Sequence, residues 1–299
     1  MEKVLITGGT GFIGRHLIPA LEQSGYKVLV KSRTPEKFKD DFFFRNVDFY
    51  WDFDETPPAD AVVNLCGENL ANKRWTVKQK RKIYTSRIEE TIKLVDWIDK
   101  QEEKPHTFIS GSAIGFYGSR GDEILNEKSE HGDLKEFQVK LCNNWELSAK
   151  RAASMGIRTS IIRTGVVLGD DGALSKMLTP FKLGLGGKLG TGKQWFSWIH
   201  IQDQVSAMMH ILKDPNLFGL YNLTAPNPVT NAELTQKLAS KLGKKASLNV
   251  PAFALKLRLG EFANLLLTGQ KVLPEALQHS GFEFQYPTLD AALEDLIDI

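Results

Sequence analysis

Residues 4–14, Val-Leu-Ile-Thr-Gly-Gly-Thr-Gly-Phe-Ile-Gly, decide the fold of this 299-residue chain. An apolar run, a glycine-rich turn and a helical apolar pattern follow one another, which is typical of the first strand, turn and helix of a Rossmann unit. Glycine permits the tight turn, the close approach of a pyrophosphate and the packing of helix on strand. The stretch predicts a dinucleotide site, the alternative being a glycine-rich turn of another α/β protein. The predicted cradle residues are Thr7, Gly8, Thr10, Gly11, Phe12, Ile13 and Gly14.

Composition places the chain among ordinary globular proteins. Hydrophobic residues make up 42% of the sequence, and 38 Lys and Arg against 36 Asp and Glu leave a net charge of +2. This balance gives no sign of a nucleic-acid or membrane partner. The two cysteines show neither a disulfide framework nor metal-ligand spacing, which suits a reducing cytosol. With no signal-peptide pattern and no long apolar run, we expect a cytoplasmic protein that binds a small-molecule substrate and no metal.

Short apolar runs alternate with helical patterns in the first part of the chain. Strands are expected at 4–6, 27–31, 47–51, 61–65, 107–109 and 159–162, and long helices at 77–101 and 134–155. This order predicts an α/β fold, a doubly wound parallel Rossmann sheet. Past Gly165 the pattern changes to loops and short elements, among them a helix that begins at a capping box of Thr230 and Glu233.

The change of pattern suggests a division into two parts. Residues 1–165 are expected to form an NADP-binding Rossmann domain, to which about 200–225 return. Residues 166–199 and 226–299 are expected to form a smaller C-terminal α+β lobe over the cleft.

The end of the second expected strand indicates the kind of nicotinamide cofactor. An NAD site usually carries an acidic residue about 20 positions beyond the glycines, which holds the ribose 2′-hydroxyl. Here Lys31, Ser32, Arg33 and Thr34 occupy that place, and the first carboxylate is Glu36. A guanidinium and a hydroxyl suit a 2′-phosphate. We therefore predict NADP(H), held by Ser32 and Arg33, with a solvated basic loop as the alternative.

Several further motifs resemble those of extended short-chain dehydrogenases/reductases. They read TGGTGFIG at 7–14, NLCG at 64–67, SAIGFYG at 112–118 and WIHIQD at 198–203. Narrower motifs resemble an atypical branch labelled "epimerase family", or nucleoside-diphosphate-sugar epimerase-like: GE at 67–68, KRW at 73–75, SRI at 86–88, WE at 145–146 and GKQWFSWIH at 192–200. The chain from about Pro251 resembles the small C-terminal domain of that branch. The resemblance implies a Rossmann fold, an NADP(H) site and a possible homodimer through the helices expected at 77–101 and 134–155.

The same resemblance implies further residues of the cofactor cleft. Leu65, Cys66 and Gly67 follow the fourth expected strand, and Arg87 stands where the family often carries an asparagine. Arg163 ends the sixth expected strand, with an ordinary ion pair at a strand end as its alternative. Since ligands collect at the carboxyl ends of parallel strands, we expect these residues to converge on one crevice.

The chain departs from the family at the catalytic residues. Extended members carry Tyr-x-x-x-Lys on the helix after strand five, where the tyrosine acts as general acid/base and the lysine lowers its pKa. Counting back from Glu146, Gln138 and Cys142 stand at these two positions, and the helix contains no tyrosine. The standard proton relay is therefore absent from the sequence.

Three residues are candidates for the missing chemistry. Ser112 matches the family's catalytic serine, Tyr117 lies in the same loop, and Cys142 offers a thiol on the helix. Each has a structural alternative: a serine that ends a strand, a tyrosine that supports its loop, and a buried core cysteine.

The loop at 189–200 places aromatic groups beside hydrogen-bonding groups, as a substrate pocket requires. His200, at its end, either titrates near neutral pH or holds the loop in place. Together these features predict an NADP(H)-dependent, epimerase-like oxidoreductase that acts on a small carbonyl or sugar-nucleotide-type substrate. The alternative is a non-catalytic NADPH-binding regulatory or scaffold protein.

Overall fold

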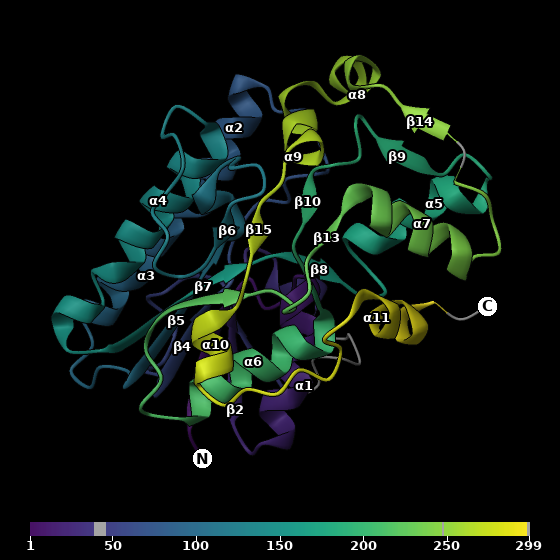
Figure 1. The fold of residues 1–299 in the computed structure, drawn as a ribbon. Coiled ribbons are helices and arrows are strands. Elements are labelled where there is room, and N and C mark those ends of the chain that lie inside the picture. Colours follow the sequence, from purple (N-terminus) through teal and green to yellow (C-terminus); the bar gives the residue numbers. More distant parts are fainter. Residues whose placement is uncertain (39–45, 247, 298–299) are drawn as a thin grey trace.

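A parallel β-sheet forms the centre of the molecule, with helices on both faces (Figure 1). The structure is a computed structural model that describes residues 1–38, 46–246 and 248–297. Within these ranges the sheet has seven strands in the order β12-β7-β5-β4-β1-β2-β3. They are β1 (Lys3–Thr7), β2 (Lys27–Lys31), β3 (Asp48–Tyr50), β4 (Ala61–Asn64), β5 (Thr107–Ala113), β7 (Arg158–Thr164) and β12 (Gly219–Leu223). The strand order reverses between β1 and β4, so the predicted doubly wound Rossmann sheet is confirmed.

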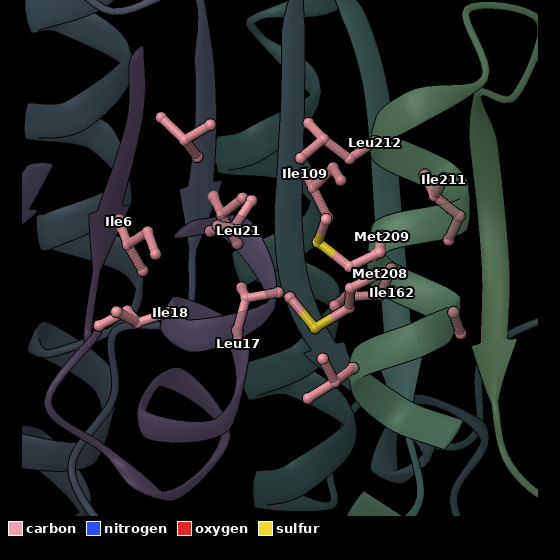
Figure 2. Packing of buried hydrophobic residues seen from close by; sticks show 14 of the residues in the cluster. Ile6, Leu17, Ile18, Leu21, Ile109, Ile162, Met208, Met209, Ile211 and Leu212 are labelled. Carbon is pink, nitrogen blue, oxygen red and sulfur yellow. The ribbon is translucent and has the colours of Figure 1, made fainter. Parts of the chain in front are cut away.

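Alternate residues of each central strand point to opposite faces of the sheet. On one face Ile6 belongs to a cluster that includes Leu17 of α1 (Phe12–Gln23) and Met208 of α6 (Ile201–Lys213) (Figure 2). On the other face Leu5 packs against α3 (Ile88–Asp99) and α4 (Phe137–Lys150), in a cluster with Leu94. The central strands β1, β4 and β5 are therefore buried on both sides, as their continuous apolar runs require.

The helix expected at 77–101 is wrong as a single element, because the chain turns at Ser86 between α2 (Val77–Thr85) and α3. The Ser86 hydroxyl donates to the carbonyl oxygen of Ile83 at 3.0 Å and accepts the backbone N–H of Glu68 at 2.9 Å. This side chain ties the helix end to the loop after β4 and ends the regular ladder there. The helix expected at 134–155 is shorter, since α4 ends at Lys150 and only a 3₁₀ turn follows it.

Short elements make up much of the remaining chain, and α7 begins at the predicted capping box of Thr230 and Glu233. A separate core around Trp198 joins β8, α5, β11, α7 and α11. The division into a Rossmann domain and a smaller C-terminal lobe, with the boundaries given above, stays a prediction. The elements are β6 (Ile124–Leu125), β8 (Val166–Leu168), α5 (Ala173–Lys182), β9 (Gly187–Leu189), β10 (Trp195–Phe196), β11 (Trp198–His200), β13 (Val229–Thr230), α7 (Asn231–Lys241), β14 (Leu248–Val250), α8 (Ala252–Leu259), α9 (Ala263–Leu267), β15 (Lys271–Val272), α10 (Glu275–His279) and α11 (Leu289–Leu296), with 3₁₀ turns η1 (Pro35–Lys37), η3 (Ile114–Tyr117), η4 (Ala153–Met155) and η5 (Gly260–Phe262).

Asp203 of α6 holds the C-terminal segment by two hydrogen bonds. Its Oδ1 accepts the backbone N–H of Gln285 at 2.8 Å, and its Oδ2 accepts that of Tyr286 at 2.9 Å. Asp203 is buried, which raises the pKa of its carboxyl although the two N–H groups act in the opposite direction. The motif at 198–203 therefore fastens a segment more than eighty residues downstream.

His200 lies beside this attachment and is completely buried. Its ring stacks on Tyr286 with 3.8 Å between centroids, and its Nε2 lies 3.1 Å from Asp295 Oδ2. The backbone N–H of Gln202 donates to Nδ1 at 3.1 Å, so Nδ1 carries no proton and Nε2–H donates to Asp295. Burial lowers the pKa of His200 below its ordinary value. His200 therefore lies where it can hold the loop in place, which is the second of the two roles that the sequence left open.

Candidate cofactor and active site

The glycine turn after β1 contains two positions that only glycine can fill. Gly8 has a φ of +74°, and a Cβ there would lie 2.6 Å from the carbonyl oxygen of Leu65. A Cβ on Gly14 would lie 2.3 Å from the carbonyl oxygen of Gly9. The turn therefore brings β1, α1 and the end of β4 into direct backbone contact.

Gly11 has different surroundings from its neighbours. The nearest atom to a Cβ at Gly11 is the carbonyl oxygen of Gly8 at 3.2 Å, so this side of the turn is otherwise open. Gly11 is the N-cap of α1, whose first turn contains no acidic residue. The positive end of the helix dipole therefore meets an open space, as a pyrophosphate requires. The geometry of the turn fits the group that the sequence predicts.

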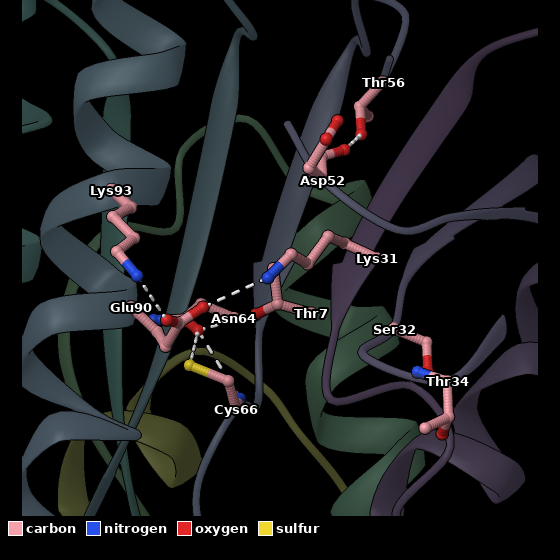
Figure 3. A network of polar contacts seen from close by, with 10 residues as sticks. All are labelled: Thr7, Lys31, Ser32, Thr34, Asp52, Thr56, Asn64, Cys66, Glu90 and Lys93. Carbon is pink, nitrogen blue, oxygen red and sulfur yellow. Dashed lines mark hydrogen bonds and ion pairs between the residues drawn. The ribbon is translucent and has the colours of Figure 1, made fainter. Parts of the chain in front are cut away.

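The end of β2 presents Arg33 to solvent. Arg33 is exposed and makes no ion pair with any described residue. Ser32 is buried, and its hydroxyl oxygen accepts the backbone N–H of Thr34 at 3.3 Å. Lys31 is engaged elsewhere, since its Nζ lies 3.1 Å from Glu90 Oε2 (Figure 3). Of the two cations at this strand end, Arg33 is therefore the one that remains available to a phosphate.

Asn64, at the end of β4, organises the loop that faces the glycine turn. Its Oδ1 accepts the Thr7 hydroxyl at 2.7 Å and lies 2.9 Å from Cys66 Sγ (Figure 3). Its Nδ2 donates to Thr91 Oγ1 at 2.8 Å and to Ser110 Oγ at 3.1 Å. Burial raises the pKa of Cys66 to about 11, so its thiol stays protonated at neutral pH and donates. Thr7 and Cys66, two of the predicted cofactor residues, thus meet on one buried amide.

Arg87 lies directly against Gly67 in the same loop. A Cβ on Gly67 would be 2.7 Å from Arg87 Cζ, so glycine makes room for the guanidinium. Arg87 Nη1 donates to the carbonyl oxygens of Glu68 at 3.0 Å and Ile83 at 3.3 Å. Its Cζ lies 5.3 Å from the centre of the Trp145 ring, and burial lowers its pKa. The structure therefore brings Gly67 and Arg87 together at the carboxyl end of β4.

Ser112, at the end of β5, is bound to a buried ion pair. Its hydroxyl donates to Glu146 Oε1 at 2.8 Å. Arg163 donates from Nε to the same oxygen at 2.8 Å and from Nη2 to Glu146 Oε2 at 2.9 Å. Arg163 and Glu146 are each 1% exposed. Arg163 thus has the ion pair that was its alternative, and no sequence pattern indicates Glu146 as its partner.

Tyr117 continues the same network away from Ser112. Its hydroxyl donates to Asn222 Oδ1 at 2.7 Å and accepts from Arg163 Nη1 at 3.0 Å. The Arg163 guanidinium also lies 3.5 Å from the centre of the Phe116 ring. Tyr117 is completely buried, and burial raises the pKa of its phenol. The Tyr117 hydroxyl therefore has two partners within the protein, as expected of a tyrosine that supports its loop.

Cys142 lies in the apolar cluster next to this network. It is 4% exposed and packs with Phe116, Tyr117, Leu125 and Val272. Burial raises the pKa of its thiol to about 12, with the Glu146 carboxylate acting in the same direction. A thiol in this environment has the properties of a core cysteine.

The loop at 189–200 binds the segment that leads to β15. Gln194 Nε2 donates to the carbonyl oxygen of Leu266 at 2.9 Å, and Ser197 Oγ donates to that of Gln270 at 2.7 Å. A Cβ on Gly269 would lie 1.9 Å from the carbonyl oxygen of Trp195, so the two backbones cross in contact. Figure 1 shows β15 running beside β10 from α9 to α10. Gln194 and Ser197, hydrogen-bonding groups of the loop in which the sequence predicts a pocket, therefore bind another part of the chain, and the substrate pocket stays a prediction.

The described residues were compared with the requirements for a membrane-spanning helix and for a metal site. None of the helices within 1–38, 46–246 and 248–297 is long and apolar enough to span a bilayer. In the same ranges no three His, Cys, Asp or Glu side chains gather closely enough to bind a metal ion.

Comparison with known families gives two matches in succession along the chain. The model of the NAD dependent epimerase/dehydratase family matches residues 4–223. A domain of unknown function matches residues 250–296. The first match spans the sheet and the glycine turn, and the second spans the segment that crosses β10.

Individual relatives match over nearly the whole chain. The "epimerase family protein SDR39U1 homolog, chloroplastic" of Arabidopsis thaliana is 39% identical over 98% of this chain and 86% of its own length. The crystal structure of human epimerase family protein SDR39U1 (isoform 2) with NADPH is 35% identical, covers 98% of both chains and superposes with a TM-score of 0.89. A structure described as the nucleoside-diphosphate sugar epimerase from Corynebacterium glutamicum is 33% identical with a TM-score of 0.78, and covers 99% of this chain and 58% of its own.

Proposed function

Because this chain belongs to the NAD dependent epimerase/dehydratase family, we propose that it binds NADP(H) at the carboxyl ends of β1, β2 and β4. The open side of the turn at Gly11 carries this proposal, because it leaves room for a pyrophosphate at the end of α1. The exposed guanidinium of Arg33 supports NADP(H) over NAD(H). The human relative that was crystallised with NADPH supports the same choice.

We further propose that the protein is an oxidoreductase or epimerase acting on a small carbonyl or sugar-nucleotide-type substrate. The bound cofactor supplies or accepts a hydride. Ser112 already donates its proton to Glu146, so its oxygen is left to accept a hydrogen bond from a substrate hydroxyl. As that hydroxyl gives its proton to Ser112, the serine proton passes to Glu146, which becomes a neutral carboxylic acid and which Arg163 holds in position. In this proposal Tyr117 and Cys142 position the loop and the helix around Ser112.

A screen of carbonyl compounds and sugar nucleotides for NADPH consumption, or for NADP⁺ reduction, tests the proposal. We expect Ser112→Ala to lower turnover without weakening NADPH binding, since the Ser112 hydroxyl is hydrogen-bonded to Glu146 and not to the glycine turn. Glu68→Gln, which leaves Ser112 and its partners intact, serves as the control.

The second candidate function is a non-catalytic NADPH-binding regulator or scaffold. It is favoured by the missing Tyr-x-x-x-Lys pair and by the burial of Tyr117 and Cys142. Tight NADPH binding with no turnover across the screen would support this function and contradict the enzymatic one.

Location and assembly belong to the same proposal. Both cysteines are free thiols, which supports a reducing compartment such as the cytoplasm. The homodimer would form through the helices that the family resemblance implies, and Leu147, 56% exposed on α4, is the position at which a substitution tests it. Light scattering after gel filtration, with Leu147→Lys as the variant, distinguishes a dimer from a monomer.

A further inference from the structure

A cavity of about 720 Å³ lies against α2, and none of the predicted cofactor residues lines it. Five of its lining side chains are cationic, and none of the described lining residues is acidic. The whole chain carries a net charge of only +2, so positive charge is concentrated here. Pockets for small molecules typically measure about 300–1,000 Å³. The cavity thus has the size and the charge to accept a small anion.

The cations reach the cavity from two neighbouring segments. Lys78, Arg81 and Lys82 lie at positions i, i+3 and i+4 of α2, which places them on one face of the helix. Lys73 and Arg74 lie in the loop that leads into this helix. The two segments together form a concave basic surface, which we call the α2 basic pocket.

Four of the five cations lack an acidic partner among the described residues. Lys82 Nζ lies 3.2 Å from Glu68 Oε1. Lys73, Arg74, Lys78 and Arg81 make no ion pair with any residue in the described parts of the chain. No acidic side chain in the described parts of the chain therefore neutralises these four charges.

This arrangement acts against the stability of α2. The helix has four cationic residues and no acidic residue in nine positions. Lys78 lies in the first turn, where the helix dipole already contributes positive charge. Like charges at i,i+3 and i,i+4 repel each other, as Lys78 does with Arg81 and Lys82. A bound anion removes both unfavourable effects.

We propose that the α2 basic pocket binds a phosphate-bearing small molecule other than NADP(H). Two phosphate groups, as in a diphosphate, would bridge the helical face and the Lys73–Arg74 loop. Ammonium and guanidinium groups are the usual partners of phosphate oxygens in proteins. The site is separate from the glycine turn, so it does not depend on the proposed cofactor site.

Other occupants fit these observations less well. A second copy of the chain would bring the same positive surface against this one, and like charges oppose such a contact. A nucleic acid contacts an extended surface, whereas here the unpaired charges surround one cavity.

Isothermal titration of inorganic pyrophosphate into NADPH-saturated protein tests the proposal at low ionic strength. We expect saturable binding, weakened about ten-fold or more in the double variant Lys78→Ala/Arg81→Ala. The matched control is Lys100→Ala/Lys213→Ala, which removes two exposed positive charges, one at the C-cap of α3 and one at the last residue of α6. The control should bind pyrophosphate like the unchanged protein, and both variants should keep their affinity for NADPH. Without ligand, Lys78→Ala/Arg81→Ala should be at least as stable to heat as the unchanged protein.

Several results would overturn the proposal. One is the absence of pyrophosphate binding to the NADPH-saturated protein. Another is an equal loss of affinity in both double variants, which would mean attraction to net charge alone. Binding that appears only without NADPH would assign the phosphate to the cofactor site. Much tighter binding of a short oligonucleotide than of pyrophosphate would point to a nucleic-acid surface.

Discussion

Gly11 and Gly14 lie three positions apart in one turn, but their neighbours predict opposite effects of substitution. We expect Gly11→Val to remain folded, with a loss of about 1 kcal/mol at the N-cap, because the one close neighbour of the new Cβ is the Gly8 carbonyl oxygen at 3.2 Å, which a small shift relieves. NADPH binding should be lost, since the new side chain stands where the pyrophosphate approaches. Titration of NADPH, followed by thermal denaturation with and without the cofactor, measures both effects.

Gly14→Ala is the contrasting variant for this prediction. Its Cβ would clash with the backbone of Gly9, so the free energy of unfolding should fall even without cofactor. If Gly11→Val still bound NADPH, the turn would not be the cofactor cradle.

Arg33 determines the expected preference between cofactors. Arg33→Ala should weaken NADPH binding by about 1–3 kcal/mol and leave NADH binding unchanged, because only NADPH carries the 2′-phosphate. Arg33→Lys keeps the charge but not the bidentate geometry, so its affinity for NADPH should lie between that of the unchanged protein and that of Arg33→Ala. Equal affinities of the unchanged protein for NADPH and NADH would contradict this prediction.

At this scale the sequence predicted the residues whose partners are near in the chain. Gly11 and Gly14 contact Gly8 and Gly9, a few positions away, so their roles follow from local geometry, whereas the contact of Gly8 with Leu65 depends on the pairing of β1 with β4. The pairing of Glu146 with Ser112 joins residues 34 positions apart, and only the packing of α4 on β5 brings them together.

Among the elements, the end of β11 and the start of α6 carry the expected pH dependence. Burial lowers the pKa of His200, while Asp295, Asp203 and Asp170 act in the opposite direction. The unfolded chain therefore takes up the proton first, near the ordinary value of 6.5. The stabilisation by neutral His200 is complete above that pH and is lost as the pH falls below it, by up to about 1.4 kcal/mol per pH unit.

Denaturant titrations between pH 7.5 and pH 5 check this dependence. His200→Asn should show a smaller loss of unfolding free energy on acidification than the unchanged protein. Exposed His279, changed to Asn, is the control and should keep the full loss. Asp203 remains in every variant, so the comparison isolates the imidazole.

The elements show where sequence periodicity is insufficient. The apolar stripe of α2 continues into α3, and this continuity predicted a single helix. The break at Ser86 results from bonds to Ile83 and to Glu68 of a different loop, which periodicity does not register. By contrast, the capping box at Thr230 is local and was predicted correctly.

For the whole molecule, Trp75 connects parts that lie far apart in the sequence. Its ring lies 5.2 Å from Phe137 of α4 and 5.7 Å from Phe262 of η5, measured between centroids. We expect Trp75→Ala to cost about 3–5 kcal/mol and to speed amide exchange in 252–267, because the C-terminal segment loses this contact. Exchange in β1 and β4 should change less, and Trp75→Phe should be milder. Uniformly faster exchange would contradict a local connection.

More of the architecture than of the candidate site could be predicted from the sequence. Apolar runs of the right length, separated by helical patterns, were sufficient for the sheet and its two covered faces. The two-residue strand β15 carries no such pattern, and its position depends on distant partners such as Ser197 and β6. The binding of this segment by Gln194 and Ser197 could therefore not be predicted from the local pattern.

The attachment of the C-terminal segment to His200 and Asp203 has a consequence for folding during synthesis. The ribosome completes β12, the last strand of the sheet, before it makes any residue of the C-terminal segment. His200 and Asp203 are thus made 82 to 95 residues ahead of their partners and remain hydrated until those partners emerge. Their burial cost falls on the final docking event alone. In a nascent chain, acidity therefore opposes the last step of folding and not the first.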